Sequence, residues 1–509
     1  MQKTSNATCV AHTPRGALRG FREDVDVYRG IPYAMPPVGP LRWAPPRPHA
    51  GWAGIRDALA FGPDCVQTPH PHLRGCGMSE DCLYLNVWTG ARSPEERRPV
   101  MVWIHGDGYT RGSGSHAIYD GQALARRGVV LVTLNYRLGL PGFLAHAGLS
   151  AESPHGSSGN YGLLDQIEAL RWVRENIAAF GGDPDRVTVF GQSAGASCTH
   201  LLMACPLAAG LFSQAILHSP GAMRPMATLT EAEASGERIG SDIAAMRDLP
   251  AHKLLEMTSL LVPARRKLAS PRGLGPIVDG WIVQGDDVDN YRRGRVRPMP
   301  LVTGIAANEG KRLSDRFAIR SVAQLEAYLA DSFGSLDALP RNYRATQDED
   351  VVPALERVIG DTQFSYGTWR VAQSMRELGA PVYQYVFARP NDGADHLPTH
   401  DDELPYVFGT LAQGGLRFVG DPARPPSPAA RSLGEQMMAA WVRFAATGNP
   451  NGDDLPHWPR LGADGAVLYF DDRISLGAMP RVDDLLFIRD LHLESPGDMP
   501  SGRTRHTTG

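Results

Sequence analysis

Ser193 lies in a sequence pattern that favours nucleophilic chemistry. Around it the chain reads VTVFGQSAGAS, a short β-branched run followed by Gly-x-Ser-x-Gly and then by a helical pattern. In such a strand-turn-helix unit, Gly191 and Gly195 permit a sharp turn that exposes the serine hydroxyl at the end of the strand. The first N–H groups of the following helix, at its positive dipole end, lie beside that hydroxyl. The pattern therefore predicts a nucleophilic serine.

Two further residues could activate this serine. A serine hydroxyl is a weak nucleophile, so it needs a histidine base and an acid that orients the imidazole. Glu309 follows an expected strand in PLVTGIAANEG, and His400 lies in ADHLPTHDDELPYVFG beyond another expected strand. The order serine, acid, histidine is the one that this strand-turn-helix unit requires. His396, four residues earlier, is a rival base, and the physics of the sequence alone leaves both histidines open.

A glycine loop precedes these residues in the chain. The stretch HGDGYTRGSGS, residues 105–115, directly follows the apolar run VMVWI, as in a loop that binds an oxyanion. Asp107 stands there where a glycine is easier to explain. Its backbone N–H could donate while the carboxylate turns away to pair with an arginine or cap a turn. Alternatively, the carboxylate faces the site, where it opposes an oxyanion about 5 Å away by roughly 3 kcal/mol at a dielectric of about 20, unless it is protonated.

Short β-branched runs alternate with helical patterns, which is typical of βαβ units around a mostly parallel sheet. The expected strands are 100–104, 129–135, 187–190, 214–217, 301–304 and 382–387. Apolar residues at helical spacing predict helices near 164–177 and 433–444. We find no repeat or linker, so the sequence predicts a single domain over residues 1–509, with a disordered tail at about 496–509.

Composition argues against several classes of function. The 509 residues are 42% apolar and 21% charged, which is enough to bury a large core. A net charge of -4 and the lack of a basic stripe argue against nucleic acid and favour a small-molecule partner. The sequence contains no run of about 18 apolar residues, which a membrane-spanning helix would need, and no recognisable export signal. We therefore expect a cytoplasmic protein. The six cysteines are expected to be reduced, and their spacing predicts no metal site.

Long motifs that follow one another along nearly the whole chain resemble one known family. They include YRGIPYAMPPVGPLRW, SEDCLYLNVW, GNYGLLDQ, FGGDPDRVTVFGQSAGA, HDDELPYVFG and WVRFAATGNPN. The chain resembles the type B carboxylesterases, which include para-nitrobenzyl esterases and cholinesterases. The resemblance implies an α/β-hydrolase fold, with a mostly parallel central sheet flanked by helices and with loop and helical insertions over the active site.

The resemblance also implies roles for the candidate catalytic residues. It makes Ser193 the nucleophile, Glu309 the acid and His400 the base. The family's histidine precedes a Glu-Leu pair by three residues, as His400 precedes Glu403. His396 becomes the weaker candidate.

Five further positions acquire roles from the same resemblance. An oxyanion hole of backbone N–H groups would come from Asp107, Gly108 and Ala194. Gln192 replaces the glutamate that many members carry before the serine, which removes a negative charge near the histidine. Ser219 matches a family serine that contacts the acid. The acyl and alcohol pockets are expected near residues 65–78 and 255–275 and at the Phe143 loop.

The segment between Cys65 and Cys82 departs from part of the family. It contains no tryptophan, whereas cholinesterases use one there to hold a quaternary ammonium by a cation–π contact. We therefore expect no preference for choline esters. The two cysteines match a family disulfide, but in a cytoplasmic chain we expect both to be reduced.

These observations predict a serine carboxylic-ester hydrolase that forms an acyl-enzyme on a small or medium neutral ester. It would need no metal or organic cofactor, and it would be a monomer or a homodimer. Two alternatives stay open. The same scaffold could catalyse a non-hydrolytic reaction of a specialised metabolite (acyl transfer, lactonisation, cyclisation or dehydration), with Asp107 altering the oxyanion hole. A non-catalytic binding module is disfavoured because the serine, acid and histidine are all present.

Overall fold

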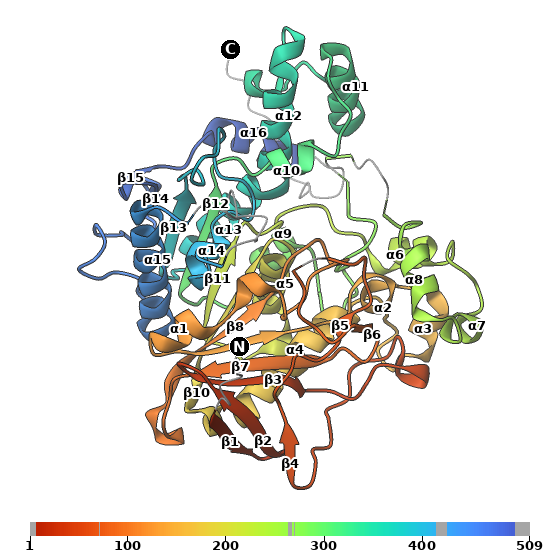
Figure 1. Cartoon of the computed structure of the whole chain (residues 1–509). Helices are drawn as coiled ribbons and strands as arrows, with labels where there is room; N and C mark the ends of the chain where they lie inside the picture. The colour runs from red at the N-terminus through yellow and green to blue at the C-terminus, as the bar shows by residue number, and fades with distance from the viewer. Residues whose placement is uncertain (1–6, 71, 263–266, 269, 414–424, 494–509) are drawn as a thin grey trace.

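The computed structural model describes residues 7–493 except 71, 263–266, 269 and 414–424 (Figure 1). The predicted disordered tail at 496–509 lies outside the described residues. One large sheet organises the described part of the chain, and twelve of its thirteen strands follow the order β1-β2-β3-β7-β9-β8-β10-β11-β12-β13-β14-β15, with β4 beside β2. The strands are β1 (Ala7–Thr13), β2 (Gly16–Arg22), β3 (Asp26–Pro32), β4 (Ile55–Asp57), β7 (Tyr84–Thr89), β8 (Arg98–Ile104), β9 (Val130–Leu134), β10 (Gly182–Gln192), β11 (Gln214–His218), β12 (Leu301–Ala306), β13 (Val382–Phe387), β14 (Ala466–Phe470) and β15 (Ser475–Ala478). Two short strands, β5 (Asp64–Cys65) and β6 (Met78–Ser79), pair separately.

The centre of this sheet is parallel and its edges are antiparallel. Every pairing from β9 through β8 to β14 is parallel. The pairings β1–β2, β2–β3, β3–β7, β7–β9 and β14–β15 are antiparallel, and the short β4 pairs parallel with β2. The central strands are buried on both faces, which is why they read as continuous apolar runs. All six predicted strands are present, and the predicted α/β-hydrolase architecture is confirmed.

Two apolar cores lie on opposite faces of the sheet. Strand β8 contributes Val100, Val102 and Ile104 to one core and Met101 and Trp103 to the other, as the two-residue period of a strand requires. The first core packs against α4 (Tyr161–Asn176), α5 (Ala194–Ala204) and α13 (Tyr366–Glu377), and the second against α1 (Gln122–Arg126), α14 (Leu404–Phe408) and α15 (Pro428–Thr447). Both predicted helices are therefore present, as α4 and α15.

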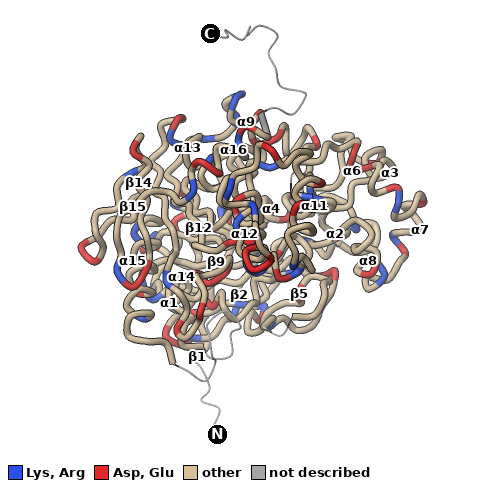
Figure 2. The backbone as a smooth tube through the Cα atoms, turned by 90° about the horizontal axis from the view of Figure 1, so that it is seen from above, with Lys and Arg blue, Asp and Glu red and all other residues tan. Residues whose placement is uncertain are grey.

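Helical insertions surround this framework (Figure 1). One group lies at the right of the view: α2 (Gly139–Phe143), α3 (Ala147–Glu152), α6 (Leu229–Gly236), α7 (Ile243–Arg247) and α8 (Ala251–Thr258). A second group lies at the top, far from β1 to β4: α10 (Lys311–Ser314), α11 (Val322–Phe333) and α12 (Val351–Gly360). The remaining helices are α9 (Asp287–Arg292) and α16 (Val482–Leu493). Seen from above, Lys and Arg are interspersed with Asp and Glu on the outer elements (Figure 2).

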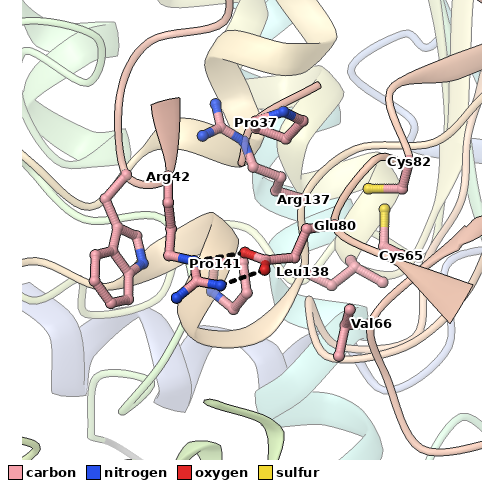
Figure 3. Close-up of a pocket in the computed structure, with 10 residues that line it drawn as sticks. Pro37, Arg42, Cys65, Val66, Glu80, Cys82, Arg137, Leu138 and Pro141 are labelled. Atoms are coloured by element: carbon pink, nitrogen blue, oxygen red, sulfur yellow. Dashed lines mark hydrogen bonds and ion pairs between the residues drawn. The ribbon is translucent and has the colours of Figure 1, made fainter. Parts of the chain in front are cut away.

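Two cysteines face each other near the β5–β6 pair (Figure 3). Cys65 and Cys82 are buried free thiols, and the Cys65 thiol donates to the carbonyl oxygen of Tyr136 at 3.0 Å. Burial, with the neighbouring Cys82, raises the pKa of Cys65 well above its ordinary value. This thiol therefore stays protonated and is a poor nucleophile. Among the described residues, no helix is both long and apolar enough to cross a membrane.

Candidate active site

Ser193 occupies a strained turn between β10 and α5. Its φ of 55° and ψ of -120° are unusual for a residue with a side chain, and its N–H donates to the carbonyl oxygen of His218 at 2.9 Å. A Cβ on Gly195 would lie 2.0 Å from the carbonyl oxygen of Ile104, and one on Gly191 would lie 2.6 Å from the carbonyl carbon of Gly195. Both glycines are therefore needed for close backbone approach at this elbow.

The structure brings Glu309 and His400 together from two neighbouring strands. Glu309 follows β12 and His400 follows β13, and the pairing of these strands continues beyond their ends through a bridge between Asn308 and Thr399. The Nδ1 atom of His400 lies 2.5 Å from Oε2 of Glu309, and both side chains are buried. The other carboxylate oxygen, Oε1, accepts from the N–H of Ala306 at 2.7 Å. Glu309 is thus held in one orientation toward the imidazole.

Ser219 and Gln192 contact the acid and the histidine loop. The hydroxyl of Ser219, at the end of β11, donates to Oε1 of Glu309 at 2.5 Å. The side-chain amide of Gln192 donates to the carbonyl oxygen of His400 and to Oδ1 of Asp401, each at 2.9 Å. Gln192 therefore fixes the backbone of the histidine loop from the strand that carries the serine.

The outer nitrogen of His400 is free to act. His400 is 8% exposed, and its Nε2 has no hydrogen-bond partner among the described residues. His396, the rival base, instead lies partly exposed with its Nδ1 2.9 Å from the carbonyl oxygen of Leu397. Of the two histidines, the structure places His400 against Glu309.

Phe364 is a neighbour of His400 that the sequence did not reveal. The two rings stack with centroids 3.9 Å apart. Phe364 belongs to a π-helical turn, η8 (Asp361–Ser365), between α12 and α13. Such turns occur often at functional sites, and Gly360, which directly precedes this one, does not distinguish it from an ordinary helical turn in the sequence. Asp401, the residue after His400, forms an ion pair with Arg312 of α10.

The glycine loop after β8 is anchored at both ends. The ring of His105 stacks on the ring of Tyr136 with centroids 4.5 Å apart. The backbone carbonyl oxygen of His105 accepts a hydrogen bond from the Tyr136 hydroxyl at 2.9 Å. Burial lowers the pKa of His105 to about 4, so this ring is neutral at pH 7. At the far end, the N–H of Gly114 donates to Oδ1 of Asn135 at 2.8 Å. The loop between these anchors is fixed relative to the sheet.

Asp107 lies in this loop with its side chain exposed at the cavity that Ser193 and His400 also line. Its φ is 67° and that of Gly108 is 66°. Among the described residues, its carboxylate forms neither the arginine ion pair nor the turn cap considered above, and the N–H groups of Asp107, Gly108 and Ala194 have no acceptor. Three backbone donors are therefore available near the serine.

The cavity has a volume of about 280 Å³. Besides the residues named above, its walls come from the predicted segment 255–275, through Leu268, Arg272 and Leu274, and from the helical insertions, through Leu313 and Tyr328. The predicted contributions of 65–78 and Phe143 were wrong. The Phe143 ring is buried against Tyr109, with centroids 5.4 Å apart, and no residue of 65–78 lines the cavity in the described structure.

A carboxylesterase family model matches residues 7–481. The chain belongs to the carboxylesterase family. Fumonisin B1 esterase of Sphingopyxis macrogoltabida is 43% identical to it over 478 residues, which cover 93% of this chain and 88% of that enzyme. Phenmedipham hydrolase of Pseudarthrobacter oxydans is 36% identical over 490 residues, covering 91% of this chain and 95% of its own.

Solved carboxylesterase structures superpose on nearly the whole chain. A PNB esterase is 33% identical with a TM-score of 0.81 and covers 96% of this chain and 99% of its own. The Geobacillus stearothermophilus carboxylesterase EST55 at pH 6.8 is 34% identical with a TM-score of 0.80, and the match covers 94% of this chain and 99% of the EST55 chain. The predicted type B carboxylesterase identity and the predicted ester hydrolysis are thus confirmed.

Proposed function

We propose that this carboxylesterase hydrolyses esters through Ser193, His400 and Glu309. The observation that carries the proposal is the state of His400. One ring nitrogen is held 2.5 Å from a buried carboxylate, the other has no hydrogen-bond partner among the described residues, and His400 lines the same cavity as a strained serine. This is the arrangement that a general base needs to take a hydroxyl proton.

The reaction then proceeds in two halves. Nε2 of His400 takes the Ser193 proton as the oxygen attacks the ester carbonyl, and Glu309 stabilises the imidazolium. The backbone N–H groups of Asp107, Gly108 and Ala194 stabilise the oxyanion. His400 then protonates the leaving alcohol, and water repeats the sequence on the acyl-enzyme.

Single substitutions test the assignment. We expect Ser193→Ala and His400→Gln each to lower kcat for 4-nitrophenyl butyrate by about 10,000-fold, because triad members act as a unit. Glu309→Gln should also lower it strongly. His396→Gln is the matched control, since it removes a histidine four residues from His400 that does not contact Glu309, and it should change kcat less than twofold. Loss of activity in His396→Gln with retention in His400→Gln would reverse the assignment.

We also propose that the enzyme works in the cytoplasm. The two buried cysteines Cys65 and Cys82 lie side by side as free thiols, and this state persists where thiols are kept reduced (Figure 3).

A further inference from the structure

The walls of the active-site cavity carry excess positive charge. The described residues that line it include two acidic side chains, Asp107 and Asp401, and five basic ones, Arg111, Lys267, Arg272, Arg312 and Arg316. The whole chain, in contrast, has a net charge of -4. A cavity lined by charges of one sign raises the local concentration of ligands of the opposite charge, so this cavity favours anions.

Much of this charge is not neutralised by the protein. Among the described residues, Arg111, Arg272 and Arg316 form no ion pair. Arg272 instead lies over the ring of Tyr109, 5.5 Å from its centroid. Loss of solvation and the charge of Arg111 lower the pKa of Arg316. The cationic groups therefore repel one another, and a bound anion would relieve that repulsion.

A smaller cavity of about 40 Å³ adjoins the first one at Arg272, which lines both. Its walls also include Arg224, which is only 7% exposed. The Nε and Nη1 atoms of Arg224 have no hydrogen-bond partner among the described residues. Arginine stays charged in proteins, and a buried charge without a partner is costly. The second cavity thus presents a buried cation without a counter-ion to a space larger than one water needs.

A carboxylate and an imidazole also line this small cavity. Asp287 accepts the N–H of Met223 at 2.6 Å through one oxygen and forms no ion pair with Arg224 in the described structure. His200 lies 3.5 Å from the other oxygen of Asp287 and is kept neutral, because burial lowers its pKa. The two arginines together still outweigh the single carboxylate.

The small cavity lies on the acyl side of the proposed reaction. The leaving alcohol must contact His400, which, like Ser193, lines the larger of the two cavities and not the small one. The small cavity is lined instead by Tyr109, next to the proposed oxyanion donor Gly108, and by Ser197, whose hydroxyl donates to the carbonyl oxygen of Ser193 at 3.0 Å. An acyl group bound to Ser193 could therefore extend toward Arg272 and Arg224.

We propose that Arg224 and Arg272 bind a carboxylate carried by the acyl group of the substrate. The preferred substrates are then half-esters of di- or polycarboxylic acids, which are anionic at neutral pH, and not simple neutral esters. This inference rests on the proposed function, since it places the acyl group on Ser193.

Two esters of equal length test the proposal. Monoethyl glutarate and ethyl valerate differ only in a carboxylate that replaces the terminal methyl group. With ethanol release measured at pH 7.5 and constant ionic strength, we expect wild-type kcat/KM to favour monoethyl glutarate by about tenfold or more. Because a hydrogen bond to a charged group is lost, Arg224→Met should lower the ratio of the two kcat/KM values by about 10- to 100-fold. The matched control Arg238→Met, at an exposed arginine that follows α6 and is absent from the lining of both cavities, should leave the ratio unchanged.

Binding of the acid alone gives a second readout that does not depend on turnover. Free glutarate should slow the labelling of Ser193 by a fluorophosphonate in the wild type and in Arg238→Met, but about tenfold less effectively in Arg224→Met. The carboxylate site would be overturned if Arg224→Met left the ratio of the two kcat/KM values unchanged. Equal protection of Ser193 by glutarate in Arg224→Met and Arg238→Met would also overturn it. If Ser193→Ala kept its activity, the proposed function itself would fail, so the two failures are distinguishable.

Discussion

Replacing Asp107 by asparagine isolates the effect of one negative charge on the oxyanion hole. Asparagine tolerates the positive φ of 67° about as well as aspartate, so the loop should keep its shape. Asp107 is exposed and lies in a cavity rich in arginine, so its carboxylate acts through a water-like dielectric. At about 5 Å and a dielectric of about 80, the repulsion is about 0.8 kcal/mol. We therefore expect Asp107→Asn to raise kcat/KM for 4-nitrophenyl butyrate by about fourfold.

The assay compares the two proteins at low and high salt, with Ser193→Ala as the blank. The gain should be largest near 10 mM salt and should vanish near 1 M, where the screening length falls to about 3 Å. A gain of about a hundredfold that survives 1 M salt would refute the reasoning, because it would place the carboxylate in a dry site that faces the oxyanion. A loss of activity would refute it in the other direction, because the carboxylate would then be needed.

Three further predictions concern the acid, stability and thiols. Ser219→Ala should lower kcat for 4-nitrophenyl butyrate about tenfold, because Glu309 loses a buried hydrogen-bond donor that helps to hold it in place, and an unchanged kcat would contradict this role. Burial lowers the pKa of His218 to about 3, below its unfolded value of about 6.5, so its contribution of up to about 5 kcal/mol is present above pH 6.5 and is lost as the pH falls toward 3. Urea unfolding should show about 2 kcal/mol of this loss between pH 7.5 and 5, and an equal loss in His218→Asn would contradict it. Denatured protein should titrate six thiols, whereas a count of four would show that one pair is oxidised, which peptide mapping would test at Cys65 and Cys82.

The sequence predicted the parallel centre of the sheet because those strands are buried on both faces and read as uninterrupted apolar runs. It did not predict β1 and β2, whose residues alternate in burial, or β4 to β6, which are only two or three residues long. It also missed β3 and β7. The Gly-x-Ser-x-Gly turn was predicted because its chemistry depends on local backbone geometry. Gly191 and Gly195 are needed there for reasons that a short stretch of chain already contains.

The surroundings of the site depend on contacts between distant segments and could not be predicted in this way. Phe364, 36 residues before His400 in the chain, stacks on it from a π-helical turn that the sequence did not predict. Arg224 and Arg272 lie in loops, and only the fold brings them to one pair of adjoining cavities. The choice between His396 and His400 likewise needed the pairing of the loops that follow β12 and β13.

The most direct test of the central claim is the mass of the protein after reaction with a fluorophosphonate. The account predicts one adduct per chain, located by peptide mapping on Ser193 and absent from Ser193→Ala, with labelling slowed strongly in His400→Gln and unaffected in His396→Gln. An adduct on another residue, or no adduct on a protein that is folded by circular dichroism, would contradict it.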